Sequence, residues 1–74
     1  MKFVAVSPVA IGNERTPIAT RNPDLPPLLV NPWQVAWIAP HTDGSCLVIT
    51  ADCTVMIFRQ SMEEIVRLLT QGVH

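Results

Sequence analysis

Charged side chains are scarce in this chain of 74 residues. Only 15% of the residues are charged, and five basic and six acidic side chains leave a formal net charge of −1. The basic residues are scattered along the sequence, at Lys2, Arg15, Arg21, Arg59 and Arg67. Proteins that bind nucleic acids or anionic membranes usually carry a basic stripe, because phosphate contacts supply much of the affinity. The charge pattern therefore disfavours both kinds of partner.

Long hydrophobic runs are also missing, although 49% of the residues are hydrophobic. No apolar stretch approaches the roughly eighteen residues of a membrane-spanning helix. The first apolar run is interrupted at Ser7-Pro8, which is too early for the core of a signal peptide. These absences lead us to expect a soluble, cytoplasmic protein.

Cysteine is limited to Cys46 and Cys53, which we place at opposite ends of one strand. At about 3.3 Å per residue, such a strand would hold them roughly 20 Å apart. A disulfide needs a Cα spacing of about 4.4–6.8 Å, so we expect two thiols and a reducing compartment.

Candidate metal ligands and catalytic groups are few, and none has the spacing of a known metal motif. Cys46 and His41 flank one hairpin loop and could form a nucleophile and base, but the only group available to orient the histidine is Asp43, which the turn explains. We therefore expect no enzyme activity, no cofactor and no metal. The candidates considered are His41, Asp43, Cys46, Asp52, Cys53 and His74.

The second half of the chain contains three β-type runs. The first run alternates, which would place Trp33 and Trp37 on one face together with Val35 and Ala39. Asp43-Gly44 supplies the positive φ that a hairpin loop needs. The expected strands cover residues 33–39, 45–50 and 54–59, with a loop at 40–44 and a turn at 51–53.

A helix is expected to begin at Ser61. Ser61 and Glu64 form a capping box, in which each side chain satisfies a backbone N–H of the other residue. Gly72 is a typical C-terminal stop. The apolar face at three-four spacing consists of Met62, Ile65, Val66, Leu68 and Leu69.

The first half of the chain is less regular. We expect a strand within residues 1–11 and a proline-rich crossover at 12–32, with extended pieces at Pro17–Thr20 and Leu28–Val30, or else a mobile arm. Together with the βββα unit at 33–74, this predicts a single α+β domain spanning residues 1–74. Its antiparallel sheet has three to five strands in a meander, and one C-terminal helix packs on one face.

Both faces of the predicted hairpin are apolar. If Asp52-Cys53 is a two-residue turn, one face carries Val48, Val55 and Ile57, and the other carries Leu47, Ile49, Met56 and Phe58. One short helix can cover only one side, so the second needs the proline-rich segment or another copy of the protein. We predict a homodimer or higher oligomer whose interaction surface is Trp33, Trp37, Val48, Val55 and Ile57.

Over residues 29–70 the pattern resembles small bacterial, flagellar-associated proteins of the FlbD/SwrD type. The matching positions are Val30-Asn31, Val35, Ile38, Asp43, Val48, Thr50 and Ser61-Met62-Glu63-Glu64-Ile65. The second turn, the missing basic residues near the last strand and the proline-rich insertion depart from the family. The resemblance implies a non-enzymatic accessory protein related to motility, and prophage proteins of this size look similar.

The sequence thus favours a protein that binds protein, itself first. The alternative is a small nucleic-acid-binding regulatory protein, which rests on the two tryptophans and Arg59.

Overall fold

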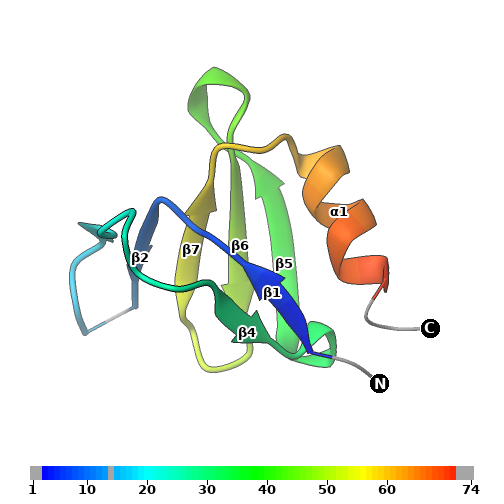
Figure 1. Ribbon diagram of the computed structural model, residues 1–74, viewed down its shortest axis with the longest axis horizontal. Coiled ribbons are helices and arrows are strands. Elements are labelled where there is room, and N and C mark those ends of the chain that lie inside the picture. Colours follow the sequence, from blue (N-terminus) through cyan, green and yellow to red (C-terminus); the bar gives the residue numbers. More distant parts are fainter. Residues whose placement is uncertain (1–2, 14, 72–74) are drawn as a thin grey trace.

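The computed structural model describes residues 3–13 and 15–71, and it confirms an α+β fold (Figure 1). Seven strands precede one helix, and two short 3₁₀ turns flank the fifth strand. The elements are β1 (Val4–Val6), β2 (Ala10–Gly12), β3 (Ala19–Thr20), β4 (Leu28–Val30), η1 (Pro32–Gln34), β5 (Val35–Pro40), η2 (Thr42–Gly44), β6 (Cys46–Thr50), β7 (Val55–Phe58) and α1 (Met62–Gln71).

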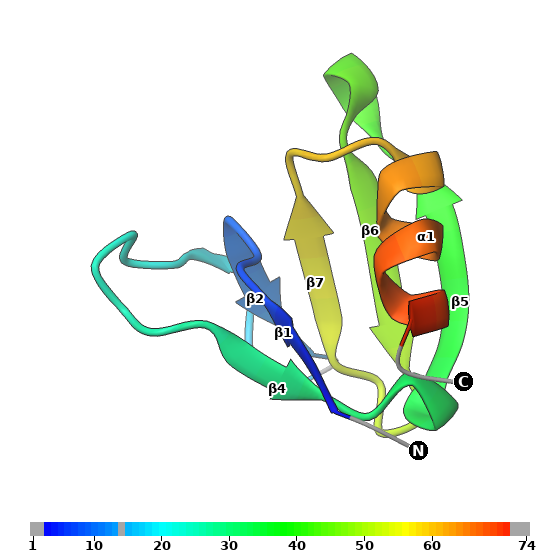
Figure 2. The same cartoon turned by 45° about the vertical axis from the view of Figure 1, so that its right-hand side comes forward.

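The strands form two sheets. Five of them make an antiparallel sheet in the order β3-β2-β7-β6-β5, so the predicted meander β5-β6-β7 is extended at β7 by the N-terminal strand β2. The other two, β1 and β4, pair with each other as a separate antiparallel ribbon. Figure 2 shows this ribbon and α1 on the same side of the five-stranded sheet.

The core lies between the sheet and these two covering elements. Phe58, Ile65 and Val48 are the largest of its fully buried side chains. We call the covered side of the sheet the inner face. Nine buried residues form the core, namely Val4, Val6, Val30, Cys46, Val48, Met56, Phe58, Ile65 and Leu69.

The turn between β6 and β7 is one residue longer than the two-residue turn assumed for the pairing of these strands. Thr50 N–H donates to Thr54 O over 3.0 Å, so three residues separate the paired positions. Cys53 has φ 67°, and its N–H donates to Thr50 O over 2.9 Å. Asp52 supports the turn, because its carboxylate accepts from the Thr50 hydroxyl and, over 3.2 Å, from Thr54 N–H. The turn expected at residues 51–53 is therefore confirmed, whereas the two-residue turn assumed for the pairing of β6 with β7 was wrong.

This extra residue changes which side chains share a face. Val48 is opposite Met56, and Leu47 is opposite Ile57. Because side chains alternate along a strand, a shift of one residue moves a side chain to the other face. Val48 is only 1% exposed and belongs to the core, so its assignment to the interaction surface was wrong.

The start of β5 also differs from the simple alternation expected. Residues 32–34 form η1, where the Asn31 side chain accepts from Trp33 N–H, so Trp33 precedes the strand. The register then shifts between Val35 and Trp37, which indicates a β-bulge. As a result Val35 packs against the core, whereas Trp37 lies on the opposite face.

The hairpin loop between β5 and β6 follows its sequence signature. Asp43 has φ 57° and Gly44 has φ 77°, as a loop with Asp-Gly predicts. His41 N–H closes the loop by donating to Ser45 O over 2.9 Å.

Helix α1 begins as predicted, at Met62 after the cap Ser61. Glu64 N–H donates to Ser61 Oγ over 3.3 Å, and the Ser61 hydroxyl in turn donates to Glu64 Oε1 over 3.4 Å. The carboxylate thus contacts the hydroxyl of Ser61, where the sequence predicted its backbone N–H. The expected stop at Gly72 and the candidate ligand His74 lie outside the described residues.

The proline-rich segment contains the short extended pieces that its sequence predicts. Part of Pro17–Thr20 forms β3, and Leu28–Val30 forms β4. The hairpin between β2 and β3 depends on Gly12, since a Cβ there would lie 2.6 Å from Ile18 Cα. Glycine permits this close approach of two backbones.

Candidate interaction surface

The face of the sheet opposite α1 is apolar across four strands. Directly opposed residues share a face, and three pairs link the strands: Trp37 with Ile49, Ile49 with Val55, and Ile57 with Leu47. Ala39 is opposite Leu47, and Ala10 is opposite Ile57. We call this set the outer face; it consists of Ala10, Trp37, Ala39, Leu47, Ile49, Val55 and Ile57.

No element of the described chain is seen over the outer face in Figures 1 and 2. Trp37 is 69% exposed, and the other six side chains are half-buried by their neighbours in the sheet. The set contains no charged or polar side chain. Ile18 lies beside Gly12, which pairs with Val55, and so extends the apolar area at the β2 edge. Antiparallel sheets that face water normally alternate apolar with polar residues, so this face is unusual.

The structure brings together three of the five residues predicted for the interaction surface, Trp37, Val55 and Ile57. Trp33 is 64% exposed but belongs to η1, and Val48 is in the core. The predicted surface did not include Ala10 or Ala39, and the predicted pairing assigned Leu47 and Ile49 to the other face of the hairpin. Pairing the strands across the whole expected turn at 51–53 would have placed Leu47 and Ile49 correctly, because a three-residue turn moves each residue of β6 opposite a different residue of β7.

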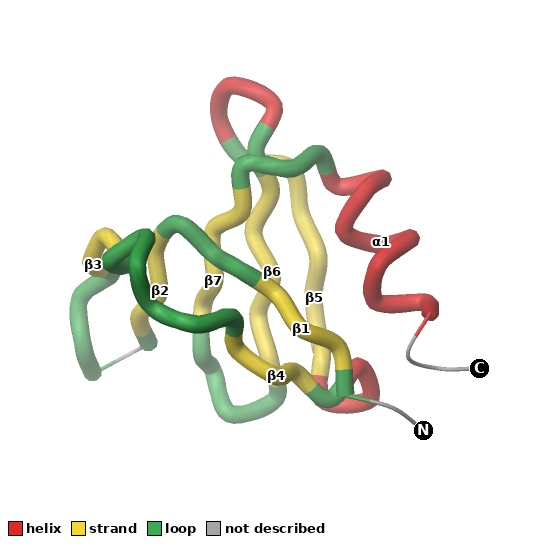
Figure 3. Tube along the Cα trace, viewed as in Figure 1, coloured by secondary structure: helices red, strands yellow, loops and turns green. Residues whose placement is uncertain are grey.

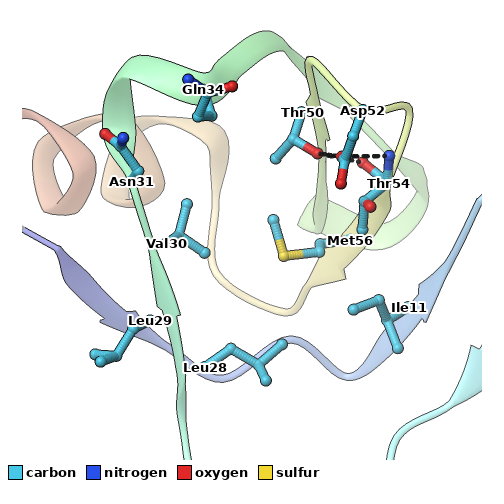
Figure 4. A pocket seen from close by; sticks show the side chains of 10 residues that line it. All are labelled: Ile11, Leu28, Leu29, Val30, Asn31, Gln34, Thr50, Asp52, Thr54 and Met56. Atoms are coloured by element: carbon cyan, nitrogen blue, oxygen red, sulfur yellow. Dashed lines mark hydrogen bonds between the residues drawn. The ribbon is translucent and has the colours of Figure 1, made fainter.

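A cleft of about 350 Å³ opens between β4 and the β6–β7 hairpin (Figure 4). Leu28, Val30 and Met56 provide apolar walls, and polar side chains gather at the hairpin end. The described residues that line the cleft are Ile11, Leu28, Leu29, Val30, Asn31, Gln34, Thr50, Asp52, Thr54 and Met56.

Among the described residues that line this cleft, Asp52 is the one charged residue. The hydrogen bond from the Thr50 side chain, followed by those from Thr54, holds the pKa of the Asp52 carboxyl below its ordinary value. These hydrogen bonds give the Asp52 carboxylate a structural role in the turn. The lining residues within the described part of the chain include no histidine, cysteine or lysine that could act with it as a nucleophile or base.

The thiol–imidazole pair considered from the sequence is not supported by the positions of its members. Cys46 is 0% exposed on the inner face, and burial raises the pKa of its thiol, whereas His41 is exposed in the hairpin loop. A reactive cysteine needs a stabilised thiolate, so Cys46 has the environment of a core residue. Cys53 lies exposed in the turn at the far end of β6, and no disulfide joins the two cysteines.

Within residues 3–13 and 15–71, no group of three or more histidine, cysteine, aspartate or glutamate side chains could hold a metal ion. The same part of the chain has no helix with both the length and the apolar character needed to cross a membrane. Comparison with protein-family models, with curated proteins and with solved structures finds no match for this chain.

Proposed function

We propose that this protein is a small, non-enzymatic, cytoplasmic accessory protein that binds protein, and first a second copy of itself, through the outer face. The supporting observation is that seven apolar side chains from four neighbouring strands form one face without a charged or polar residue. Burial of such a face is worth about 25 cal/mol per Å² of apolar surface.

The occupant that fits best is an identical outer face. A flat sheet packs face to face on another sheet about 10 Å away, with interdigitating apolar side chains. A two-fold axis makes such a contact self-complementary, and two-fold dimers are the commonest oligomers. The outer face carries no charge that a partner would have to neutralise.

The size of the face limits the strength of this association. Four strands spaced about 4.8 Å apart and five residues long cover on the order of 300 Å² in projection. Stable interfaces bury about 800 Å² on each partner, so the rim of the sheet must contribute as well. We therefore expect a reversible dimer with a dissociation constant in the micromolar range.

The mass in solution tests the proposal. Sedimentation equilibrium over a range of concentrations should show a monomer of 8.2 kDa that converts to a species of twice that mass. A constant monomer mass up to high micromolar concentration would contradict self-association.

The second candidate, a single-stranded nucleic-acid binder, is favoured by one observation, the exposure of Trp37 on the outer face of the sheet. Aromatic side chains on such sheets stack with bases. The outer face has no cation beside Trp37 to contact phosphates, so this candidate has less support. A motility-related or prophage-related setting follows only from the resemblance and is also a proposal.

A further inference from the structure

Two arginines that are far apart in the sequence line one cleft of about 400 Å³. Arg21 follows β3 and Arg59 follows β7. The described residues that line it are Ser7, Pro8, Val9, Thr20, Arg21, Pro23, Leu25 and Arg59. We call this site the arginine cleft.

The order of the strands brings the two arginines to the same end of the sheet. β2 lies between β3 and β7, as Figure 3 shows. Arg21 N–H donates to Val9 O over 2.9 Å, and Val9 N–H donates to Ile57 O over 2.8 Å. Backbone hydrogen bonds thus connect Arg21 through Val9 to Ile57, and Arg59 is two residues beyond Ile57.

The arginine cleft is positively charged, because the described residues that line it include two arginines and no aspartate or glutamate. The guanidinium of Arg21 donates to Pro26 O, which holds this side chain against the proline-rich segment. Among the described residues, the one ion pair joins Arg67 to Glu63. Both guanidinium groups of the cleft therefore lack an acidic partner within the described chain.

The remaining surface of the cleft is both polar and apolar. Ser7 and Thr20 add hydroxyl groups, which can donate to an oxyanion. Pro8, Pro23 and Leu25 form apolar walls beside the charged groups. A cleft of this volume, with apolar walls and a few converging polar groups, has the general character of a small-molecule site.

We propose that the arginine cleft binds a small organic anion, namely a phosphate monoester or carboxylate attached to an apolar group. Guanidinium groups bind these oxyanions through paired N–H donors. The apolar part of the ligand would lie against Pro8, Pro23 and Leu25. This site borders the outer face at Thr20, which is opposite Ala10, but the inference does not depend on self-association.

The test uses the full chain and phenyl phosphate as the probe. Phenyl phosphate should produce saturable amide shifts at Val9, Thr20 and Leu25 in ¹⁵N-resolved NMR spectra, with a dissociation constant in the millimolar range or below. Benzyl alcohol, which has a similar ring and no charge, should produce no saturable shift. Absence of saturable shifts with phenyl phosphate, or equal binding of both probes, would overturn the proposal.

Two variants identify the groups responsible. Arg59→Gln should weaken phenyl phosphate binding about five-fold, because exposed ion pairs contribute modestly. Arg67→Gln removes an equal charge on α1, outside the cleft, and should leave binding unchanged. Equal weakening by both variants would show a nonspecific charge effect and overturn the site. Tighter binding of a thymidine decanucleotide than of phenyl phosphate would overturn it too, in favour of nucleic acid.

Discussion

Trp37 on β5 is directly opposite Ile49 on β6, on the face that points away from α1. Trp37 is the most exposed of the large apolar side chains in the described part of the chain, at 69%. Its neighbours on the outer face are half-buried apolar side chains. Trp37 and these neighbours therefore form one continuous apolar surface. This relationship gives the most direct test of the outer face.

Trp37→Lys should weaken self-association by at least ten-fold, because a dimer that buries the outer face would have to bury an unpaired ammonium group. The substitution should leave the fold of the monomer intact, since Trp37 is exposed. Leu29→Lys is the matched control: Leu29 is 68% exposed but lies on β4, on the opposite side of the sheet. Sedimentation velocity of both variants measures the effect, and equal dissociation by both would place the interface elsewhere.

Val48→Lys should unfold the protein, whereas Val55→Lys should fold and lose only self-association. Val48 is almost fully buried, and a lysine there would cost more than about 3 kcal/mol of stability. Val55 is half-buried on the outer face. Circular dichroism and urea unfolding distinguish the two variants, and a folded Val48→Lys protein would contradict the three-residue turn.

Gly12→Ala should destabilise the protein by about 1–3 kcal/mol, because the added Cβ would lie 2.6 Å from the Ile18 backbone. Gly44→Ala is a useful comparison. Its φ of 77° is also unfavourable for alanine, but nothing lies within 4 Å of the added atom. We expect a loss of about 1 kcal/mol there. Thermal unfolding of both proteins measures the difference, and an equal effect would remove the case for a steric requirement at Gly12.

Thr50→Val should raise the pKa of the Asp52 carboxyl toward its ordinary value, because the Thr50 hydroxyl is the main group that lowers it. A carboxyl whose pKa is lowered in the folded state contributes stability above its unfolded pKa. That contribution is lost as the pH falls through the folded pKa, below about pH 4. Carboxyl-detected NMR titration checks the shift, and an unchanged pKa in the variant would mean that another group is responsible.

Cys46 should resist alkylation by iodoacetamide in the native protein, since it is buried and burial raises the pKa of its thiol. Cys53 is exposed and should react faster. Mass spectrometry of digested samples, taken with and without urea, compares the two sites. Rapid native modification of Cys46 would contradict its core position and reopen the thiol–imidazole hypothesis.

Elements defined by neighbouring residues could be predicted from the sequence. The cap at Ser61 and the three-four spacing of apolar residues predicted α1, and Asp43-Gly44 predicted the positive φ values of the loop. Leu28–Val30 was also predicted as an extended piece. In each case the interactions that decide the conformation lie within a few residues of one another.

The candidate surface was predicted only in part, because its composition depends on turn length. Asp52 and Cys53 are compatible with a two-residue or a three-residue turn. The positive φ of Cys53 and the bonds of Asp52 select the longer one, and that choice moves Val48 into the core. The bulge before Trp37 has a similar effect on Val35.

The sequence by itself determined that this protein is a small α+β domain with more apolar β surface than one helix can cover. Only the tertiary structure decided which side chains remain on the outer face, and that Arg21 and Arg59 line one cleft. The physical reason is that register and strand order depend on contacts between residues far apart in the chain. Local conformational preferences do not determine which of those contacts form.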